Sequence, residues 1–595
     1  MTAGEHYRSR RAAATAEAER HGRRSRGYST TRVVVFLLFA GAVVLALRGD
    51  SRGWIAAAVA LVVFVVLAIL HERVVDAESY ARRVVAWADQ GLARLENRYD
   101  VIEAGVPKVE DTHAYLGDLD VLGPRSLLAS LDTTRTSPAR ALLAGWLLSP
   151  SAPAEVRARQ EQAKVLAERS DLREALWAEG ARLAKEPPSI EPLLAWIEGP
   201  SLHLPSSVAF RAFALLLPAC TVALLFFGGA LPFLPRAAWV APLLLQLALH
   251  ARHRVAIRAA VAAVSDHHLD LARYARMFAV VEQGGLLTGP KTSAAIARLS
   301  RIASFVDARR NEVFRLFIGP LLSWDLSCAL ACEAFRATVG ADLRARLAEL
   351  AHIEAHAALG TRAFERPEDV FPEILEGGAP RLFAEELAHP LLAAEKAVRN
   401  SVTMDGAGTV LLVTGSNMSG KSTLLRALGA NVVLALAGAP VRAKRLATSP
   451  FDVRTSMRIR DSLDDGVSHF FAELRRLKAV VDAADAATTD PQRPPVLFLL
   501  DEILHGTNSR ERHIGARAIV HHLVRCRGCG AVSTHDLDLA ALEGEAKGHV
   551  RNVHFREQVD GDTMTFDYVL REGPVTSSNA LRLMRMVGLE VEEPR

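Results

Sequence analysis

Two uninterrupted apolar stretches lie near the N-terminus. Val33–Leu47 carries no charge, and after the short turn Arg48–Gly53 a second uncharged stretch runs over Trp54–Leu70. Each is a little shorter than the roughly 20 residues that cross a bilayer, but basic and aromatic side chains on the flanks can extend a span by snorkelling. The pattern predicts a transmembrane hairpin over 33–70 behind a basic tail over 1–32. A cleaved signal peptide is the alternative, and the long charged leader disfavours it.

A second candidate hairpin runs over 208–250. Residues 212–231 are nearly all apolar, a turn follows around 232–236, and 237–249 are apolar again. Pro218, Pro242 and Gln246 weaken this interpretation, so a pair of buried core helices stays open as the alternative. Arginines cluster before and after the first hairpin and after the second, whereas the two turns carry only Arg48, Arg52 and Arg236. By the positive-inside rule we expect an inner (plasma) membrane protein with both termini in the cytoplasm.

The segments around the second hairpin repeat apolar residues at three- and four-residue spacing. This periodicity covers 76–97, 137–195 and 251–360, with few glycines, and predicts amphipathic helices. We therefore expect all-α segments over 76–207 and 251–375. The Pro/Gly-rich stretch 367–380 predicts a linker, after which 376–595 alternates short β-rich runs with helices.

A phosphate-binding motif stands in this C-terminal region. The apolar strand pattern Thr409–Thr414 leads directly into a loop and then a helical run, and the loop satisfies G-x-x-x-x-G-K-[ST]. Backbone N–H groups of such a loop and of the following helix N-terminus surround phosphate oxygens. The nine ATP-binding candidates are Gly415, Ser416, Asn417, Met418, Ser419, Gly420, Lys421, Ser422 and Thr423. Lys421 would reach the β- and γ-phosphates, and the Ser422 hydroxyl would ligate Mg²⁺.

Two further strand ends carry polar groups that suit ATP hydrolysis. The run 495–500 ends at Asp501 and Glu502, where one acid can hold Mg²⁺ and the other can activate water. The run 531–534 ends at His535, which can contact a γ-phosphate. We therefore assign Asp501 with Ser422 to the metal, and Lys421, Glu502 and His535 to catalysis.

Composition changes this picture little. The chain has 595 residues, of which 50% are apolar, and a net charge of +4. That charge is too small to indicate nucleic-acid binding. Five cysteines do not make a disulfide scaffold and indicate a reducing compartment. Cys526 and Cys529 with His521 and His522 have workable metal spacing, but the absence of a second ligand pair disfavours a metal site.

Several motifs together resemble the ATPase domain of the MutS DNA mismatch-repair family, within the ABC-type ATPases. They are GSNMSGKST (415–423), DDGVSHFFAE (464–473), LLDEILHGTNSRER (499–512) and STHD (533–536), and they span roughly 380–590 with their margins. Weaker likeness to the family's helical core begins at Asp118. The resemblance implies a C-terminal α/β ABC-type P-loop ATPase domain, preceded by an all-α core or lever domain that two transmembrane helical hairpins interrupt.

The resemblance also implies a dimer that closes around two ATP molecules with Mg²⁺. Ser468 matches the serine that contacts the γ-phosphate held by the other subunit, and Asn508 falls in the turn that meets the partner's nucleotide. Ala397 and Val398 stand where mismatch-repair members tend to offer an aromatic to adenine. The family's Phe-x-Glu mismatch wedge has no candidate ahead of the helical core.

Two outputs follow. The resemblance implies a membrane-anchored ATPase that binds mismatched or branched DNA. The alternative is a mechanochemical or scaffolding ATPase that acts on a protein partner without mismatch recognition.

Overall fold

The computed structural model describes residues 1–99, 113–181, 190–200, 204–205, 208–228, 235–265, 267–307, 310–416, 419–457, 469–504, 507–546, 548–560 and 563–575. Its contacts divide the chain into two compact units. The first comprises Met1–Thr133, Arg140–Ser170 and Ala355–Arg595, and the second comprises Thr134–Ala139 and Asp171–Glu354.

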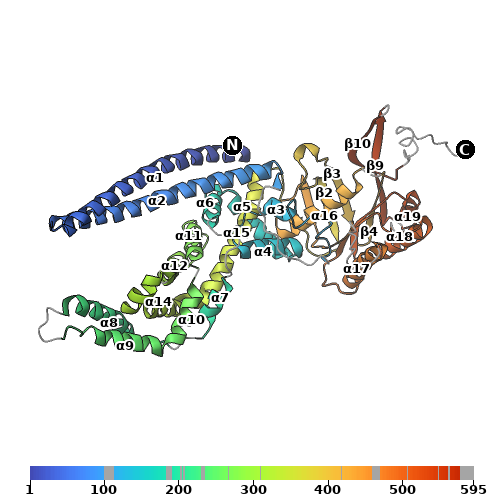
Figure 1. Ribbon diagram of the computed structural model, residues 1–595. Coiled ribbons are helices and arrows are strands. Elements are labelled where there is room, and N and C mark those ends of the chain that lie inside the picture. The colour runs from blue at the N-terminus through green and yellow to red at the C-terminus, as the bar shows by residue number, and fades with distance from the viewer. Residues whose placement is uncertain are drawn as a thin grey trace. The chain divides into compact units, whose positions relative to one another are not determined.

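The first unit begins with two long antiparallel helices, α1 (Ala3–Leu47) and α2 (Arg52–Leu95), which pack along their length (Figure 1). A capping box between Thr2 and Glu5 starts α1. The residues expected as a basic tail therefore belong to the same helix as the first apolar run, because they are rich in Ala, Arg and Glu and contain no proline. Gly53 permits the close approach after the turn, since a Cβ there would lie 2.5 Å from the Ala46 backbone nitrogen.

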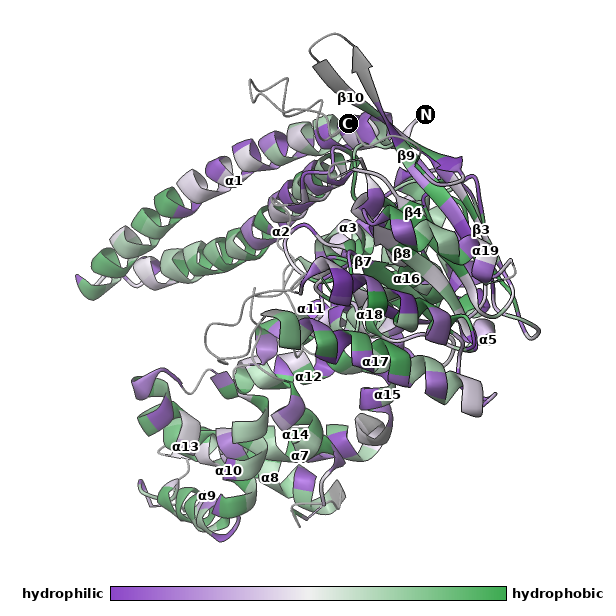
Figure 2. Cartoon of the chain, turned by 90° about the vertical axis from the view of Figure 1, so that its right-hand side faces the viewer, coloured by the Kyte–Doolittle hydropathy of each residue, from purple (hydrophilic) through white to green (hydrophobic). Residues whose placement is uncertain are grey.

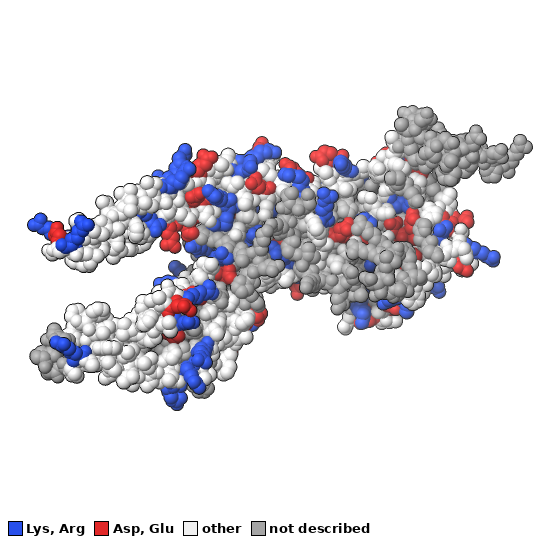
Figure 3. Space-filling view, in the orientation of Figure 1, with Lys and Arg blue, Asp and Glu red and all other residues white. Residues whose placement is uncertain are grey.

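The apolar halves of α1 and α2 are exposed. Figure 2 shows them as hydrophobic toward the connecting turn and hydrophilic toward the opposite end, and Figure 3 shows a stretch without charge between the charged turn and the charged base. Within the described part of the chain, three helical segments are long and apolar enough to cross a membrane, namely α1, α2 and Ala209–Phe227. The structure thus agrees with the sequence for the first hairpin and for the first half of the second, whereas the returning segment Val240–Arg252 is an apolar helix of only 13 residues.

A six-stranded sheet forms the centre of the C-terminal domain. Its strand order is β10-β9-β4-β8-β7-β6, with β10 antiparallel to β9 and the other neighbours parallel. The strands are β4 (Thr409–Thr414), β6 (Asp452–Ser456), β7 (Val496–Asp501), β8 (Gly528–Thr534), β9 (Val550–Asp560) and β10 (Thr563–Glu572). The carboxyl ends of β4, β7 and β8 therefore meet at one edge, as the sequence motifs require.

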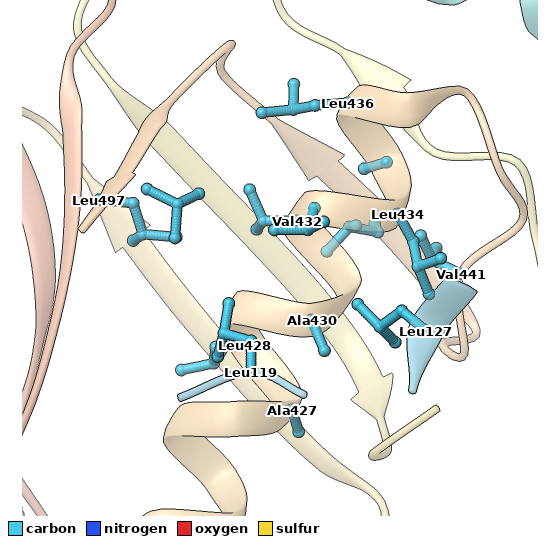
Figure 4. Packing of buried hydrophobic residues seen from close by; sticks show 14 of the residues in the cluster. Leu119, Leu127, Ala427, Leu428, Ala430, Val432, Leu434, Leu436, Val441 and Leu497 are labelled. Atoms are coloured by element: carbon cyan, nitrogen blue, oxygen red, sulfur yellow. The ribbon is translucent and has the colours of Figure 1, made fainter. Parts of the chain in front are cut away.

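Helices cover both faces of this sheet because the strands are apolar on both sides. On one face α16 (Lys421–Ala437) packs against Leu411, Val413 and Leu497, together with Leu119 and Leu127 from upstream (Figure 4). On the other face α17 (His469–Thr489) and α18 (Ser509–Leu523) pack against Leu412, Phe498 and Val532. The short helix α19 (Leu542–Glu545) precedes β9.

A second, four-stranded sheet has the order β1-β5-β2-β3. It contains β1 (Glu373–Ile374), β2 (Arg381–Leu387), β3 (Asn400–Asp405) and β5 (Arg445–Thr448). The stretch 367–380, expected as a linker, carries β1, which pairs with β5. The division between the units instead falls at Glu354 and Ala355, inside α15 (Leu343–Glu365). Ile374 in this stretch is buried, so the stretch is part of the folded domain. Its prolines and glycines therefore mark turns within that domain.

The remaining helices of the first unit are short. They are α3 (Leu127–Leu131), α5 (Pro153–Ala167) and most of α4 (Ser137–Leu148).

The described part of the second unit is helical, as the periodicity predicts. Its helices are α6 (Ser170–Gly180), α7 (Glu191–Glu198), α8 (Val208–Phe227), α9 (Val240–Arg252), α10 (Arg254–Val264), α11 (His268–Gln283), α12 (Thr292–Asp307), the π-helix η4 (Phe314–Ile318), α13 (Gly319–Leu321) and α14 (Trp324–Val339). The expected second hairpin corresponds to α8 and the shorter α9, which pack together.

Candidate nucleotide-binding site

The phosphate loop connects β4 to α16. Gly415 has φ +149° and Gly420 has φ +107°, and a Cβ at Gly415 would lie 2.8 Å from the Ser419 hydroxyl oxygen. Both positions therefore need glycine, because L side chains rarely adopt these angles. Lys421, Ser422 and Thr423 form the first turn of α16. Asn417 and Met418 lie outside the described residues.

Some polar groups of the phosphate loop are positioned to bind a ligand. The hydroxyls of Ser416 and Ser419 are buried and find no hydrogen-bond partner among the described residues. The Lys421 ammonium group donates to the carbonyl oxygens of Gly415, at 2.8 Å, and of Ser416, at 2.9 Å. Burial lowers the pKa of Lys421, and the nearby Glu502 and Asp501 carboxylates oppose that shift. An anion in the loop would satisfy the hydroxyls and draw the lysine away from its own backbone.

The acids at the end of β7 converge on this lysine. Glu502 Oε1 lies 3.6 Å from Lys421 Nζ and 3.7 Å from His535 Nδ1. Glu502 adopts φ +47°, and its backbone N–H donates to the carbonyl oxygen of Ser533 at 3.2 Å. Asp501 accepts a hydrogen bond from the Ser533 hydroxyl. Strands β7 and β8 thus bring Asp501, Glu502 and His535 to the phosphate loop.

A cavity of about 960 Å³ opens beside the loop. Ser416, Gly420, Lys421, Ser422, Thr423, Asp501 and Glu502 line it on the phosphate side. Ser422 and Asp501 present a hydroxyl and a carboxylate oxygen, which are the ligands that Mg²⁺ prefers. These residues therefore fit the metal that the motif implies.

Residues outside the phosphate-binding and acidic motifs also line the cavity. They are chiefly His389, Asn400 and Tyr568, with Lys396, Ala397 and Val398 beside them. Burial, and then the charge of Arg426, lower the pKa of His389 to about 4, so this imidazole is neutral. His389 and Tyr568 lie within 380–590, where the sequence resembles the MutS ATPase domain, and this resemblance is the signal that points to them.

Ala397 and Val398 offer no aromatic ring to a base, but Tyr568, which lines the same cavity, does. A Cβ on Gly420 would lie 3.1 Å from the Tyr568 ring. The Asn400 side chain holds the tyrosine in place, because its amide donates to the Tyr568 carbonyl at 3.0 Å and its oxygen accepts from the Leu570 N–H at 2.7 Å. Tyr568 has φ +54° at an irregularity in β10, which turns it toward the loop.

The two residues assigned to a partner subunit's nucleotide have different outcomes. Ser468 lies outside the described residues. Asn508 caps α18, where its side-chain oxygen accepts from the Glu511 N–H at 2.9 Å, and it does not line the cavity.

The possible metal site at Cys526 and Cys529 does not form as the spacing suggested. The two cysteines belong to clusters on opposite faces of the sheet. Cys526 lies near Asp485 and His522, with the three ligand atoms within 4.8 Å of one another. Burial, and then its hydrogen bond to Asp485, raise the pKa of Cys526 to about 11, which disfavours the thiolate that binds metal.

Comparison with known proteins identifies the C-terminal domain. The family described as MutS domain V matches residues 411–592. The chain is 32% identical over 229 residues to the DNA mismatch repair protein MutS of Desulfosudis oleivorans, which covers 37% of this chain and 25% of that protein. It is 30% identical over 215 residues to the DNA mismatch repair protein MutS of Natronomonas pharaonis, which covers 36% and 24%.

The chain thus matches about a quarter of the length of these relatives. The matched part contains the phosphate loop, both acids of β7 and His535. Residues 411–592 are thus a C-terminal domain of the MutS domain V family.

Proposed function

We propose that this protein is a membrane-anchored, MutS-like ATPase that binds and hydrolyses ATP with Mg²⁺. The observation that carries the proposal is the convergence of Lys421, Glu502 and His535 beside a glycine-hinged phosphate loop and a cavity large enough for a nucleotide. The match of residues 411–592 to MutS domain V supports it.

In this proposal each residue has a defined task. The loop N–H groups and Lys421 bind the phosphates, and Lys421 exchanges its bonds to Gly415 and Ser416 for phosphate oxygens. Ser422 and Asp501 would hold Mg²⁺, which neutralises phosphate charge when bound. Glu502 accepts the proton of the attacking water, and His535 orients the γ-phosphate. Tyr568 offers its ring to the base.

ATP turnover by the purified full chain tests this assignment. Glu502→Gln keeps the size of the side chain but removes the base, so we expect ATP binding to persist while hydrolysis falls by at least about 100-fold. Lys421→Ala should weaken ATP binding itself. Asp485→Asn, on α17 outside the cavity, is the matched control and should hydrolyse ATP normally. Unchanged turnover in Glu502→Gln would refute the catalytic assignment.

The membrane part of the proposal is supported by the exposed apolar halves of α1 and α2 and by α8. Large side chains such as Leu37, Leu38 and Val62 are more than half exposed, which water does not favour over such a length. In the proposed topology both pairs, α1–α2 and α8–α9, enter the inner membrane from the cytoplasm, where the ATPase domain lies.

The output of ATP hydrolysis has two candidates. The relatives are DNA mismatch repair proteins, which supports mismatched or branched DNA as the partner. The match covers only the C-terminal domain, and the remaining helices carry exposed apolar faces, which favours work on a protein partner in the membrane.

Binding of homoduplex, mismatched and branched DNA distinguishes these outputs. It should be measured as a function of salt, with and without ATP, because phosphate contacts weaken as salt rises. Binding that prefers a mismatch or a branch supports the DNA output. No binding at low salt would refute it and leave the protein partner.

A further inference from the structure

The second unit has a patch in which polarity is inverted. Gln246 of α9 is 2% exposed and Thr221 of α8 is fully buried, whereas Phe226 and Phe227 of α8 are 73% and 71% exposed. The Gln246 amide donates to the Thr221 hydroxyl and to the Leu217 carbonyl oxygen, at 3.3 Å for the latter. Polar groups thus bond to one another inside while large apolar groups face outward.

This arrangement extends into the helical segment 251–375, which the sequence pattern predicts to lie outside the membrane. The Ser323 hydroxyl donates to Gln246 Oε1 at 3.0 Å, so the turn between α13 and α14 joins the same buried polar node. Helix α13 also packs against α8 and α9. The segment from Phe314 to Leu321 is therefore attached to the α8–α9 pair.

The attached segment exposes large apolar side chains of its own. Over η4 and α13 no residue is buried, and Leu316, Phe317 and Ile318 are 61%, 71% and 42% exposed. Together with α14 the segment is long and apolar enough for a membrane span, but the two parts are bent by 69° relative to each other. Its shape is that of an element that enters an apolar medium and turns back.

Aromatic and charged groups surround the base of this segment. Trp324 donates from its indole N–H to the Phe305 carbonyl at 2.6 Å, and its ring makes edge contacts with Phe305 and Phe314. Arg315, the second residue of η4, lies 3.6 Å from Glu312, which precedes the segment, and both are largely exposed. Indole rings beside charged side chains are typical of the boundary between lipid and water.

We propose that η4 and α13, residues 314–321, form a re-entrant tip that inserts into the bilayer beside α8 and α9. The occupant of the exposed face is lipid. Gln246 precedes Arg252 by six residues, which corresponds to roughly 9 Å along a helix, so the Ser323 contact places the tip inside the basic boundary. This inference rests on the proposed placement of α8 in the membrane.

Lipid accounts for the inverted polarity better than a protein partner. A water-soluble partner would cover an apolar patch on a unit whose polar groups otherwise face outward. Here Thr221, Gln246 and Ser323 point inward and satisfy one another, as polar groups between helices do in a bilayer. Leu316 and Phe317 are exposed to a similar extent as Phe226 and Phe227 of α8.

Spin-label accessibility tests the tip in the full chain, reconstituted in vesicles of phosphatidylethanolamine and phosphatidylglycerol. The five native cysteines are replaced by alanine, and ATP binding confirms that this background folds. Single cysteines are then introduced as Phe317→Cys and Leu316→Cys at the tip, Phe226→Cys on α8 and Val165→Cys on α5. Collision rates are measured with oxygen, which concentrates in lipid, and with a water-soluble nickel chelate.

We expect the ratio of oxygen to nickel collisions at 316, 317 and 226 to be several-fold higher than at 165. A high ratio at 226 with low ratios at both tip positions would overturn the re-entrant tip and leave the membrane-anchored ATPase standing. Low ratios at all positions would refute the membrane placement of α8 and the tip with it. The ATPase proposal is tested separately by ATP turnover, so no outcome of the collision measurements decides it.

Discussion

Arg94 at the end of α2 and Glu365 at the end of α15 form a buried ion pair, with 2.7 Å between Arg94 Nη2 and Glu365 Oε1. Their side chains are 2% and 4% exposed. The Tyr7 hydroxyl of α1 donates to the same carboxylate at 2.8 Å. The base of the α1–α2 pair is thus joined to the helix that leads into the ATPase domain.

Removing the charge of Glu365 should destabilise this junction strongly. Glu365→Gln leaves Arg94 charged and buried, and breaking a buried pair from one side costs about 3–5 kcal/mol of the free energy of unfolding. Glu376→Gln is the matched control, because its pair with Arg157 is about half exposed and contributes less than about 1 kcal/mol. Urea unfolding in detergent measures both. Equal losses would contradict the structural role of the buried pair.

A composite site formed by two subunits predicts complementation. Lys421→Ala and Ser468→Ala should each hydrolyse ATP poorly alone. In a mixture, half-sites that combine the intact phosphate loop of one subunit with the intact Ser468 of the other should restore part of the activity. ATP turnover as a function of mixing ratio is the measurement. Mixtures no more active than the sum of the two variants would rule out Ser468 acting on a partner's nucleotide.

Tyr568 should determine affinity for the base. Loss of the ring in Tyr568→Ala should raise the Kd for ATP roughly two- to tenfold, as expected for about 0.5–1.5 kcal/mol of aromatic contact. Tyr568→Phe keeps the ring and should bind like the unchanged protein. Titration with a fluorescent ATP analogue checks both variants. An unaltered Kd in Tyr568→Ala would exclude stacking on this side chain.

His389 should make stability depend on pH in a defined window. Its folded pKa of about 4 is below the ordinary value of 6.5, so between these values the unfolded chain binds the additional proton. Stability is therefore full above pH 6.5 and falls as the pH decreases toward 4. His389→Asn should flatten this slope in the apparent Tm of the domain. The same slope with and without the histidine would assign the pH dependence to other groups.

The turn between α1 and α2 tests the topology. A single cysteine introduced as Ser51→Cys in the cysteine-free chain should react with an impermeant maleimide added outside the inner membrane. A cysteine introduced as Ser509→Cys in the ATPase domain should react only after the membrane is opened. Labelling of position 51 from the cytoplasmic side alone would reverse the proposed orientation.

Contiguous patterns in the sequence were sufficient to locate much of the candidate site. The phosphate loop, Asp501, Glu502 and His535 each follow a strand, and parallel strands bring their carboxyl ends to one edge, so their convergence was predictable. The stretch 367–380 was misread as a linker, since proline and glycine mark turns inside a sheet as well as domain boundaries. The charge pattern predicts a separate basic tail over 1–32, whereas α1 begins at Ala3, because these polar residues also have high helix propensity.

The sequence by itself determined the chemistry of the phosphate loop, the apolar stretches and the helical character of the segments between them, because each depends on residues close together in the chain. Only the tertiary structure decided which distant residues contact these segments. Asn400 holds Tyr568 across 168 positions, Arg94 meets Glu365 across 271, and Ser323 meets Gln246 across 77. Such contacts depend on how distant elements pack, and no local pattern of hydrophobic and polar residues encodes that packing.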